Sequence, residues 1–366
     1  MSKTGILIVN LGTPDSPKVN DVKRYLTEFL TDKRVIDLPP IKRQLLVRGI
    51  IVPFRAPKVA KEYKKLWLEE GSPLLVYGQR LVDQLQILFN KDVVVELAMR
   101  YQNPSIASAL KKLRDSKADR IIVFPLFPQY ASATTGSVVE KVMDIIKEWN
   151  VVPSIDFINS YHTDHRFIAA FADKIKTDIS NFHPDHILFS YHGIPERHLR
   201  NIQKNDASKC QWPSCDCGHH PMNKPFCYRS ACFKTSELLA QKLELNFTQF
   251  TTSFQSRLGK DPWIQPYTDE TIKHLTRIGV KKLLVVSPSF VADCLETTLE
   301  IGEEYHELFK ENGGEAFHLT ESLNADVPWA EAIYEIINEK LNPDETTNIN
   351  NNTIPSPTPN LCTATG

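Results

Sequence analysis

Residues 7–14 read LIVNLGTP, an apolar, strand-forming run that ends in a Gly-Thr-Pro turn. Residues 188–195 read LFSYHGIP, and here glycine and proline fall at the same offsets. A second pair behaves alike, because 120–130 and 282–292 each hold a strand-like run followed by Pro-x-Phe. We therefore predict that the chain repeats one α/β unit; chance similarity between buried strands is the alternative.

Short β-branched runs alternate with amphipathic stretches along the chain, which is typical of parallel sheets covered by helices. The predicted strands are 5–11, 93–98, 120–124, 154–158, 186–190, 246–251, 282–287 and 315–319. The predicted helices are 19–30, 74–89, 105–116, 136–149, 166–180, 231–243, 269–278, 295–311 and 328–341. The expected fold class is α/β, with two similar Rossmann-like domains and a cleft between them.

The length of 366 residues favours two domains of about 150 residues each. We expect an N-terminal domain at 1–150 and a C-terminal domain at 151–341. A disordered tail is expected at 342–366, because that segment is rich in Asn, Thr and Pro without periodicity. Two regions interrupt the repeat, namely 31–75 and a cysteine-rich insertion at 201–232.

Composition narrows the choice of partners. The net charge of −1 gives no electrostatic support for a nucleic-acid partner. The first residues lack the pattern of a signal peptide, and no apolar run approaches the roughly 20 residues that span a bilayer. We expect a cytoplasmic protein with reduced cysteines, of undetermined oligomeric state.

A histidine and a line of acids follow two of the predicted strands. His192 enters a turn formed by Gly193 and Pro195, while Glu296, Glu300 and Glu304 stand at i, i+4 and i+8 on one helical face. The carboxyl ends of parallel strands are where α/β proteins bind ligands. We predict a site for proton removal and transient metal binding. The alternatives are a structural histidine and a solvated acidic face.

Five cysteines lie between residues 210 and 232, in a chain without a secretory signal, so a metal site is expected. Their spacing is not the paired Cys-x2-Cys of a zinc ribbon. It fits an iron–sulfur cluster at least as well as zinc. We expect a [2Fe–2S] cluster, with zinc as the alternative and incidental buried thiols as the simplest explanation. The predicted ligands are Cys210, Cys217, Cys227 and Cys232, with Cys215 as an alternative to Cys217.

Eight segments resemble, in order, those of the ferrochelatase family over about residues 4–340. They are 5–14, 71–74, 98–101, 127–137, 190–195, 253–259, 262–263 and 293–297. The resemblance implies a lyase of the class II chelatase fold that inserts Fe2+ into protoporphyrin IX. The products would be protohaem and two protons, at the terminal step of haem biosynthesis. Rival interpretations are a chelatase for coproporphyrin III, cobalt or a sirohaem precursor, and a tetrapyrrole or metal carrier without turnover.

The resemblance also implies roles for individual residues. His192 would be the catalytic histidine and Glu296 its acidic partner across the cleft, and both would bind iron together with Glu300 and Glu304. Contacts to the porphyrin would come from Arg55, Ser72, Arg100, Tyr101, Tyr130 and Trp263. Residues 31–75, called the lip below, would border the active site and face the inner membrane peripherally.

Two positions depart from the family pattern. Many relatives have histidine where this chain has Cys294, so a metal ligand is in question there. Relatives that use coproporphyrin often have tyrosine where this chain has Asp15, which favours protoporphyrin as the substrate.

Overall fold

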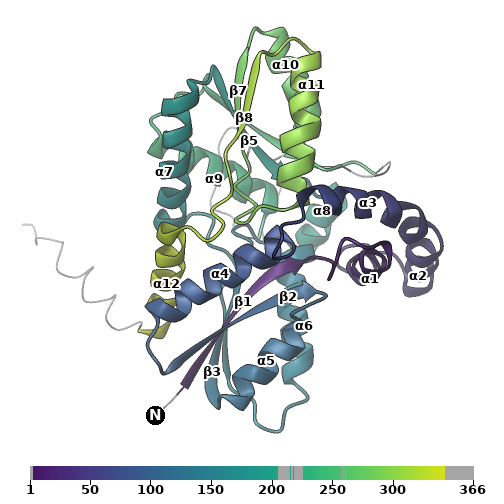
Figure 1. Ribbon diagram of the computed structural model, residues 1–366, viewed down its shortest axis with the longest axis vertical. Helices are drawn as coiled ribbons and strands as arrows, with labels where there is room; N and C mark the ends of the chain where they lie inside the picture. The colour runs from purple at the N-terminus through teal and green to yellow at the C-terminus, as the bar shows by residue number, and fades with distance from the viewer. Residues whose placement is uncertain are drawn as a thin grey trace, which may run out of the picture.

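The computed structural model describes residues 3–204, 215, 217, 226–257, 259 and 261–342. Cys210 and the predicted tail beyond Asn342 lie outside these ranges. The described chain forms two four-stranded sheets with helices around them, one sheet above the other along the long axis (Figure 1). None of the helices in these ranges is long and apolar enough to cross a membrane.

The two sheets have the same strand order. The first runs β2-β1-β3-β4 and consists of β1 (Lys3–Gly12), β2 (Val93–Tyr101), β3 (Ala118–Pro125) and β4 (Ser154–Phe157). The second runs β6-β5-β7-β8 and consists of β5 (His186–His192), β6 (Phe250–Gln255), β7 (Lys282–Val286) and β8 (Ala316–Leu319). Every pairing between these strands is parallel. Because β1 corresponds to β5 and β3 to β7, the predicted internal repeat is confirmed.

Most predicted helices are present with small shifts at their ends, and α1 (Val19–Leu30) has the predicted bounds. The others are α4 (Pro73–Leu88), α5 (Ile106–Asp115), α6 (Ser137–Ile146), α7 (His165–Phe182), α9 (Tyr228–Lys242), α10 (Thr268–Arg277) and α12 (Val327–Leu341). Among the elements that the sequence did not predict are α2 (Pro40–Leu46), η1 (Val47–Ile51), η2 (Ser132–Gly136), α3 (Val52–Leu66) and α8 (Glu196–Lys204). The lip is therefore largely helical.

The strand predicted at 246–251 is wrong, because β6 begins only at Phe250. Asn246 forms a turn instead: its Oδ1 accepts the Thr248 amide at 3.0 Å, and its own amide donates to Gln249 Oε1 at 2.9 Å. Strand β6 continues past the predicted end because it pairs with β5, from the pair Ile187 and Phe250 to the pair His192 and Gln255. The tertiary partner thus overrides the local apolar pattern.

The regular α-helix predicted at 295–311 is also wrong in its first part. Glu296–Tyr305 is a π-helix, η3, and only α11 (His306–Glu311) is α-helical. The Tyr305 hydroxyl donates to Glu300 Oε1 at 3.0 Å, across five residues. A π-helix bonds i to i+5, so it brings these two side chains together, which an α-helix does not.

The first sheet extends past residue 150, since β4 pairs with β3. The C-terminal helix also returns to the N-terminal half: α12 packs on α4 and α7, and the rings of Phe89 and Tyr334 are 4.8 Å apart. The expected boundary at residue 150 therefore falls before the last strand of the first sheet.

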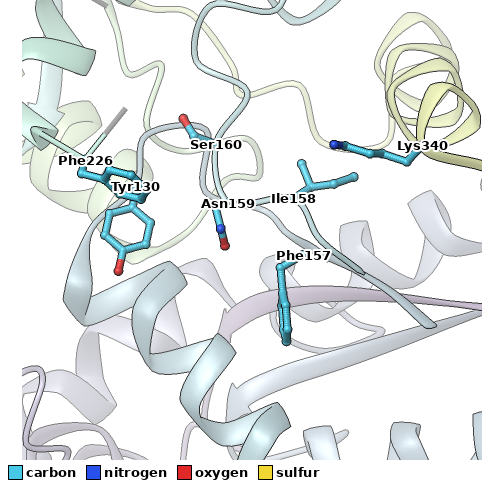
Figure 2. Close-up of a pocket in the computed structure, with 7 residues that line it drawn as sticks. All are labelled: Tyr130, Phe157, Ile158, Asn159, Ser160, Phe226 and Lys340. Carbon is cyan, nitrogen blue, oxygen red and sulfur yellow. The ribbon is translucent and has the colours of Figure 1, made fainter. Parts of the chain in front are cut away.

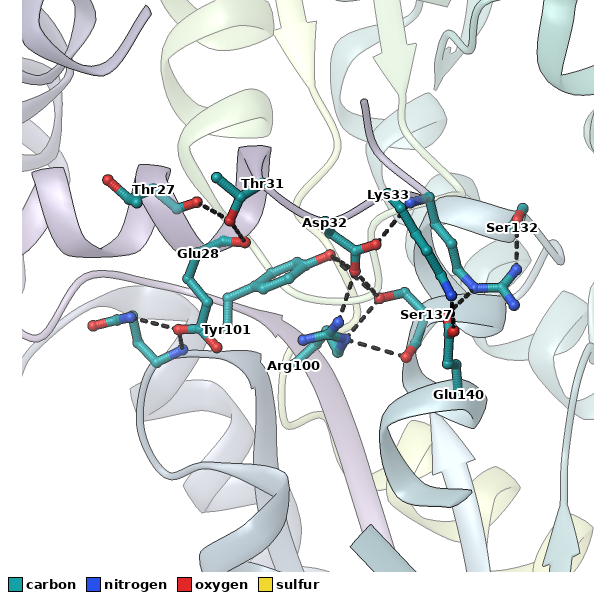
Figure 3. A network of polar contacts seen from close by, with 12 residues as sticks. Thr27, Glu28, Thr31, Asp32, Lys33, Arg100, Tyr101, Ser132, Ser137 and Glu140 are labelled. Atoms are coloured by element: carbon teal, nitrogen blue, oxygen red, sulfur yellow. Dashed lines mark hydrogen bonds and ion pairs between the residues drawn. The ribbon is translucent and has the colours of Figure 1, made fainter. Parts of the chain in front are cut away.

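A buried carboxylate joins the lip to the first sheet. Asp32, just after α1, accepts Arg100 Nη2 at 2.7 Å, the Tyr101 hydroxyl at 2.9 Å and Ser137 Oγ at 2.5 Å (Figure 3). The Arg34 amide adds a fourth bond at 2.7 Å. The Asp32 side chain is 5% exposed and that of Arg100 14%. We call these five residues the Asp32 cluster.

Burial by itself would raise the pKa of Asp32, but the bonds from Ser137, Arg34, Arg100 and Tyr101 together hold that pKa below its ordinary value. The folded-state pKa is thus lower than the unfolded one, about 3.9. The stabilisation is complete above the unfolded value and is lost as pH falls through the folded one.

Gly12 should not tolerate a side chain. Its φ is +127°, and a Cβ there would lie 2.1 Å from the Tyr101 carbonyl oxygen. We expect Gly12→Ala to lower the free energy of unfolding by about 3 kcal/mol, because backbone strain adds to a steric clash. Gly49→Ala is the control, since a Cβ at Gly49 meets no atom within 4 Å. Equal stability of the two variants in urea denaturation would contradict this account.

Asp32→Asn should destabilise the fold in a pH-dependent way. At pH 7 we expect a loss of about 3 kcal/mol, because the variant leaves the Arg100 charge buried without its counter-ion. The difference from wild type should begin to shrink only below about pH 4, where Asp32 of the unfolded chain takes up a proton, and it should disappear as pH falls through the lower pKa of folded Asp32. Denaturant titrations at several pH values measure this, with Asp144→Asn at an exposed pair as the control. A difference that does not vary with pH would refute it.

Candidate active site

The main chain and ring of His192, at the carboxyl end of β5, are held by three hydrogen bonds. Its amide donates to Ser289 Oγ at 3.3 Å, and its carbonyl accepts the Tyr228 hydroxyl at 2.8 Å. Nδ1 lies 2.6 Å from the Gly193 carbonyl oxygen. A carbonyl can only accept, so Nδ1 carries the proton, and Nε2 holds the lone pair of the neutral ring. The imidazole is thereby prepared as a proton acceptor.

The turn after His192 brings it against two aromatic rings. Trp263 and Phe290 each have ring centroids 6.3 Å from that of His192. The Gly193 amide donates to the Gln255 carbonyl oxygen at 2.8 Å, and a Cβ at Gly193 would come within 2.8 Å of the same oxygen. Glycine is therefore required for this close approach of strands β5 and β6. The structure thus brings His192 and Trp263 together, and it adds Phe290, which the sequence did not single out.

Glu296 and Glu300 occupy the first part of η3. Burial raises the pKa of Glu300, and the charge of Glu296 acts in the same direction. His192 and the hydroxyls of Ser256 and Tyr305 oppose this rise. The three predicted residues thus lie near enough for their charges to interact. Ser256 also has a left-handed φ of 65°, a strained conformation that brings its hydroxyl to Glu300.

The solvent exposure of the acidic side chains increases along η3. Glu304 is exposed, unlike Glu296 and Glu300, and its neighbour Glu303 accepts a hydrogen bond from Lys65 of the lip at 2.6 Å. Among the described residues, no group of three or more His, Cys, Asp or Glu side chains is arranged to hold a metal ion. The iron-binding roles of His192, Glu296, Glu300 and Glu304 remain predictions.

Two tyrosines from outside the two repeats complete this side of the site. Tyr25 of α1 and Tyr63 of α3 are buried, with ring centroids 6.3 Å apart. Burial raises the pKa of both phenols, and the nearby Glu296 raises them further. Neither tyrosine stands out in the sequence, where their only signal is a position on the apolar face of a helix.

Cys294 packs rather than facing open space. It is 9% exposed and belongs to an apolar cluster with Leu74 and Ala292. Burial raises the pKa of the thiol well above its ordinary value, and the charge of Glu296 adds to this. The thiol is therefore protonated at neutral pH, which favours packing over metal ligation.

The structure places the other predicted porphyrin-binding residues in different settings. Arg55 is exposed on α3. Ser72 is 2% exposed and accepts a hydrogen bond from Thr13 at 2.7 Å. Arg100 and Tyr101 belong to the Asp32 cluster, so their polar atoms already hold the lip in place.

Tyr130 lines a small pocket to which His192 does not contribute. Its ring meets that of Phe226 edge-on at 5.3 Å. Ser160 and Lys340 also line this pocket (Figure 2). The cavity volume is about 240 Å³. This is below the roughly 300–1,000 Å³ typical of pockets for drug-sized ligands. The pocket is therefore a poor candidate for holding a macrocycle.

Four of the predicted cluster cysteines are described, and Cys210 is not. Cys217, Cys227 and Cys232 are buried, while Cys215 is half-buried with its Sγ 3.5 Å from that of Cys217. Burial raises the pKa of Cys217 to about 11, against the opposing charge of Arg229, which donates to its Sγ at 2.8 Å. Burial also raises the pKa of Cys232, and Cys227 and Cys217 contribute. Cys217 and Cys227 therefore lie near Cys232 at the start of α9. Thiolates in such a group would suit a soft metal ion.

Comparisons with solved structures identify the fold. SirB from Bacillus subtilis, solved with Fe3+, matches with a TM-score of 0.54 at 12% identity, over 94% of this chain and 98% of that chain. The sirohydrochlorin chelatase SirB in complex with cobalt matches with a TM-score of 0.52 at 12% identity, over 94% and 97% of the two chains. At this identity the likeness extends to the fold alone, and it confirms the predicted class II chelatase architecture.

Sequence comparisons identify the family. A family model described as Ferrochelatase matches residues 3–341. A ferrochelatase of Legionella pneumophila (strain Corby) is 47% identical over 340 residues, which are 93% of this chain and 100% of that relative. One of Coxiella burnetii (strain Dugway 5J108-111) is 43% identical over 344 residues, which are 93% and 94% of the two chains. The chain belongs to the ferrochelatase family.

Proposed function

We propose that this chain inserts Fe2+ into protoporphyrin IX, the terminal step of haem biosynthesis, at the edge where His192 faces Glu296 and Glu300. Family membership supports the reaction class. The observation that carries the site is the fixed tautomer of His192, which leaves Nε2 as the base, close enough to the half-buried Glu300 to affect its pKa. A carrier without turnover has no need of such a base.

The chemistry follows from these groups. Two pyrrole N–H protons must leave the porphyrin as the metal enters, so that the products are haem and two protons. His192 Nε2 accepts one proton from a pyrrole nitrogen. Glu300, whose pKa burial raises, takes up a proton more readily than an ordinary glutamate and can pass it on beside Glu296. Imidazole and carboxylate bind ferrous iron as a substrate without the tight grip of thiolates.

The lip supplies further binding features. Arg55 is exposed and can bind a propionate bidentately. Asp15 holds a negative charge near the end of β1, bonded to Arg24 at 3.0 Å and Asn103 at 2.9 Å. Relatives that use coproporphyrin often have tyrosine at this position, so Asp15 favours protoporphyrin as the substrate. Competition between the two porphyrins tests this choice of substrate.

We further propose that the lip touches the inner membrane from the cytoplasmic side. Several large apolar side chains are exposed there, among them Ile41 at 76% and Phe54 at 78%. They lie on α2 and α3, which project from the first sheet (Figure 1). An exposed apolar surface of this kind suits a poorly soluble macrocycle delivered from a bilayer.

We also propose a [2Fe–2S] cluster held by Cys210, Cys217, Cys227 and Cys232, with Cys215 as the alternative to Cys217 and zinc as the alternative metal. The burial of Cys217, Cys227 and Cys232, and the effect of the first two on the pKa of the third, support it. When bound, the cluster supplies thiolate–iron bonds that tie the insertion to α9. The metallation step above uses no cysteine.

His192→Ala should abolish turnover while the porphyrin still binds. We expect kcat in an anaerobic assay with protoporphyrin and ferrous iron to fall by about 10²–10⁴-fold, because the general base is lost. Porphyrin affinity, measured by fluorescence quenching, should change little. His165→Ala, at an exposed position on α7, is the control. Near-normal turnover in His192→Ala would refute the assignment, and no metalloporphyrin from wild type would refute the function.

Protein purified without oxygen should absorb visible light as a [2Fe–2S] centre does, with about two iron and two sulfide per chain. Cys227→Ser should remove this absorption, because a ligand is lost. Cys294→Ser is the matched control at a buried thiol outside the insertion, and it should keep the colour. A colourless sample with stoichiometric zinc would overturn the cluster.

A further inference from the structure

The main chain of His192 is held by side chains from two distant parts of the sequence. Tyr228, the first residue of α9, donates its hydroxyl to the His192 carbonyl across 36 residues. Ser289, in the turn after β7, accepts the His192 amide across 97 residues. Two side chains thus hold the His192 main chain, one at its N–H group and the other at its C=O group. We call this pair of hydrogen bonds the clamp.

Helix α9 is a firm support for this clamp. The Tyr191 and Ser236 hydroxyls are 3.0 Å apart, which joins α9 to β5. Thr235 Oγ1 donates to the His162 carbonyl at 3.1 Å and accepts Gln129 Nε2 at 3.0 Å, which joins α9 to the first half of the chain. The position of Tyr228 is therefore set by the packing of the whole helix.

Tyr228 remains a donor at any pH used in an assay. It is 5% exposed, and burial raises its pKa well above the ordinary value. The hydroxyls of Tyr228 and Ser289 also interact with each other, so the two halves of the clamp are linked. Since a carbonyl offers no proton, the phenol must supply the one that this bond requires.

We propose that Tyr228 and Ser289 are positioning residues that fix the His192 main chain, and through it the direction of Nε2 toward the porphyrin nitrogens. The inference rests on the proposed function of His192. Neither residue needs to touch the substrate. Their effect is geometric, because a displacement of about 1 Å at a reacting group can cost about 10²-fold in rate.

The test compares Tyr228→Phe with Tyr191→Phe. Both remove a phenol hydroxyl that joins β5 to α9, but only the first bond reaches His192. We expect Tyr228→Phe to lower kcat at least about tenfold while KM for porphyrin stays within about twofold. Tyr191→Phe should lose similar thermal stability and keep its kcat. Ser289→Ala should repeat the fall in kcat at constant KM.

The inference is overturned if Tyr228→Phe keeps wild-type kcat, or if Tyr191→Phe loses as much kcat as Tyr228→Phe. If Tyr228→Phe does not fold, Ser289→Ala decides, because it breaks the other main-chain bond, and a wild-type kcat there would contradict the clamp. His192→Ala is assayed in parallel. An active His192→Ala variant would refute the proposed function itself. If His192→Ala is inactive while Tyr228→Phe is fully active, only the positioning role is refuted.

Discussion

The parallel pairing of β5 with β6 and β7 is the constraint on which the rest of the site depends. His192 ends β5, Ser256 follows β6, and Ser289 follows β7. Since the strands are parallel, these residues emerge at one edge of the sheet. The register that pairs His192 with Gln255 brings Gly193 within 2.8 Å of the neighbouring strand, and thereby sets the turn that orients the imidazole.

A second constraint holds the lip against this edge. The Asp32 cluster attaches the lip to β2 and α6, while Lys65 bonds to Glu303 on η3. Arg197 of α8 adds an ion pair to Asp37 at 2.6 Å. Tyr25 and Tyr63 are thereby placed beside Glu296, although they belong to neither of the two repeated sheets. The lip is thus a wall of the site built on the N-terminal half.

The sequence predicted much of this arrangement, for reasons visible in particular residues. Parallel strands are buried on both faces, and Ile6, Leu7, Ile8 and Val9 are fully buried as their apolar run implies. The Gly-x-Pro turns after β1 and β5 marked equivalent strand ends. The bounds of β6 could not be predicted, because they depend on pairing with β5, which is distant in sequence. The π-helix could not be predicted either, because it goes with a side-chain bond across five residues.

By itself, the sequence determined the α/β class, the repeat of one unit, the family, and the residue types that can accept protons. Those properties follow from local periodicity and from motifs whose residues are adjacent in the chain. Only the tertiary structure decided which nitrogen of His192 carries the proton, how Glu300 differs from the exposed Glu304, and that Arg100 and Tyr101 anchor the lip. The physical reason is that tautomer, pKa and hydrogen-bond partner depend on burial and on neighbours that folding alone brings together.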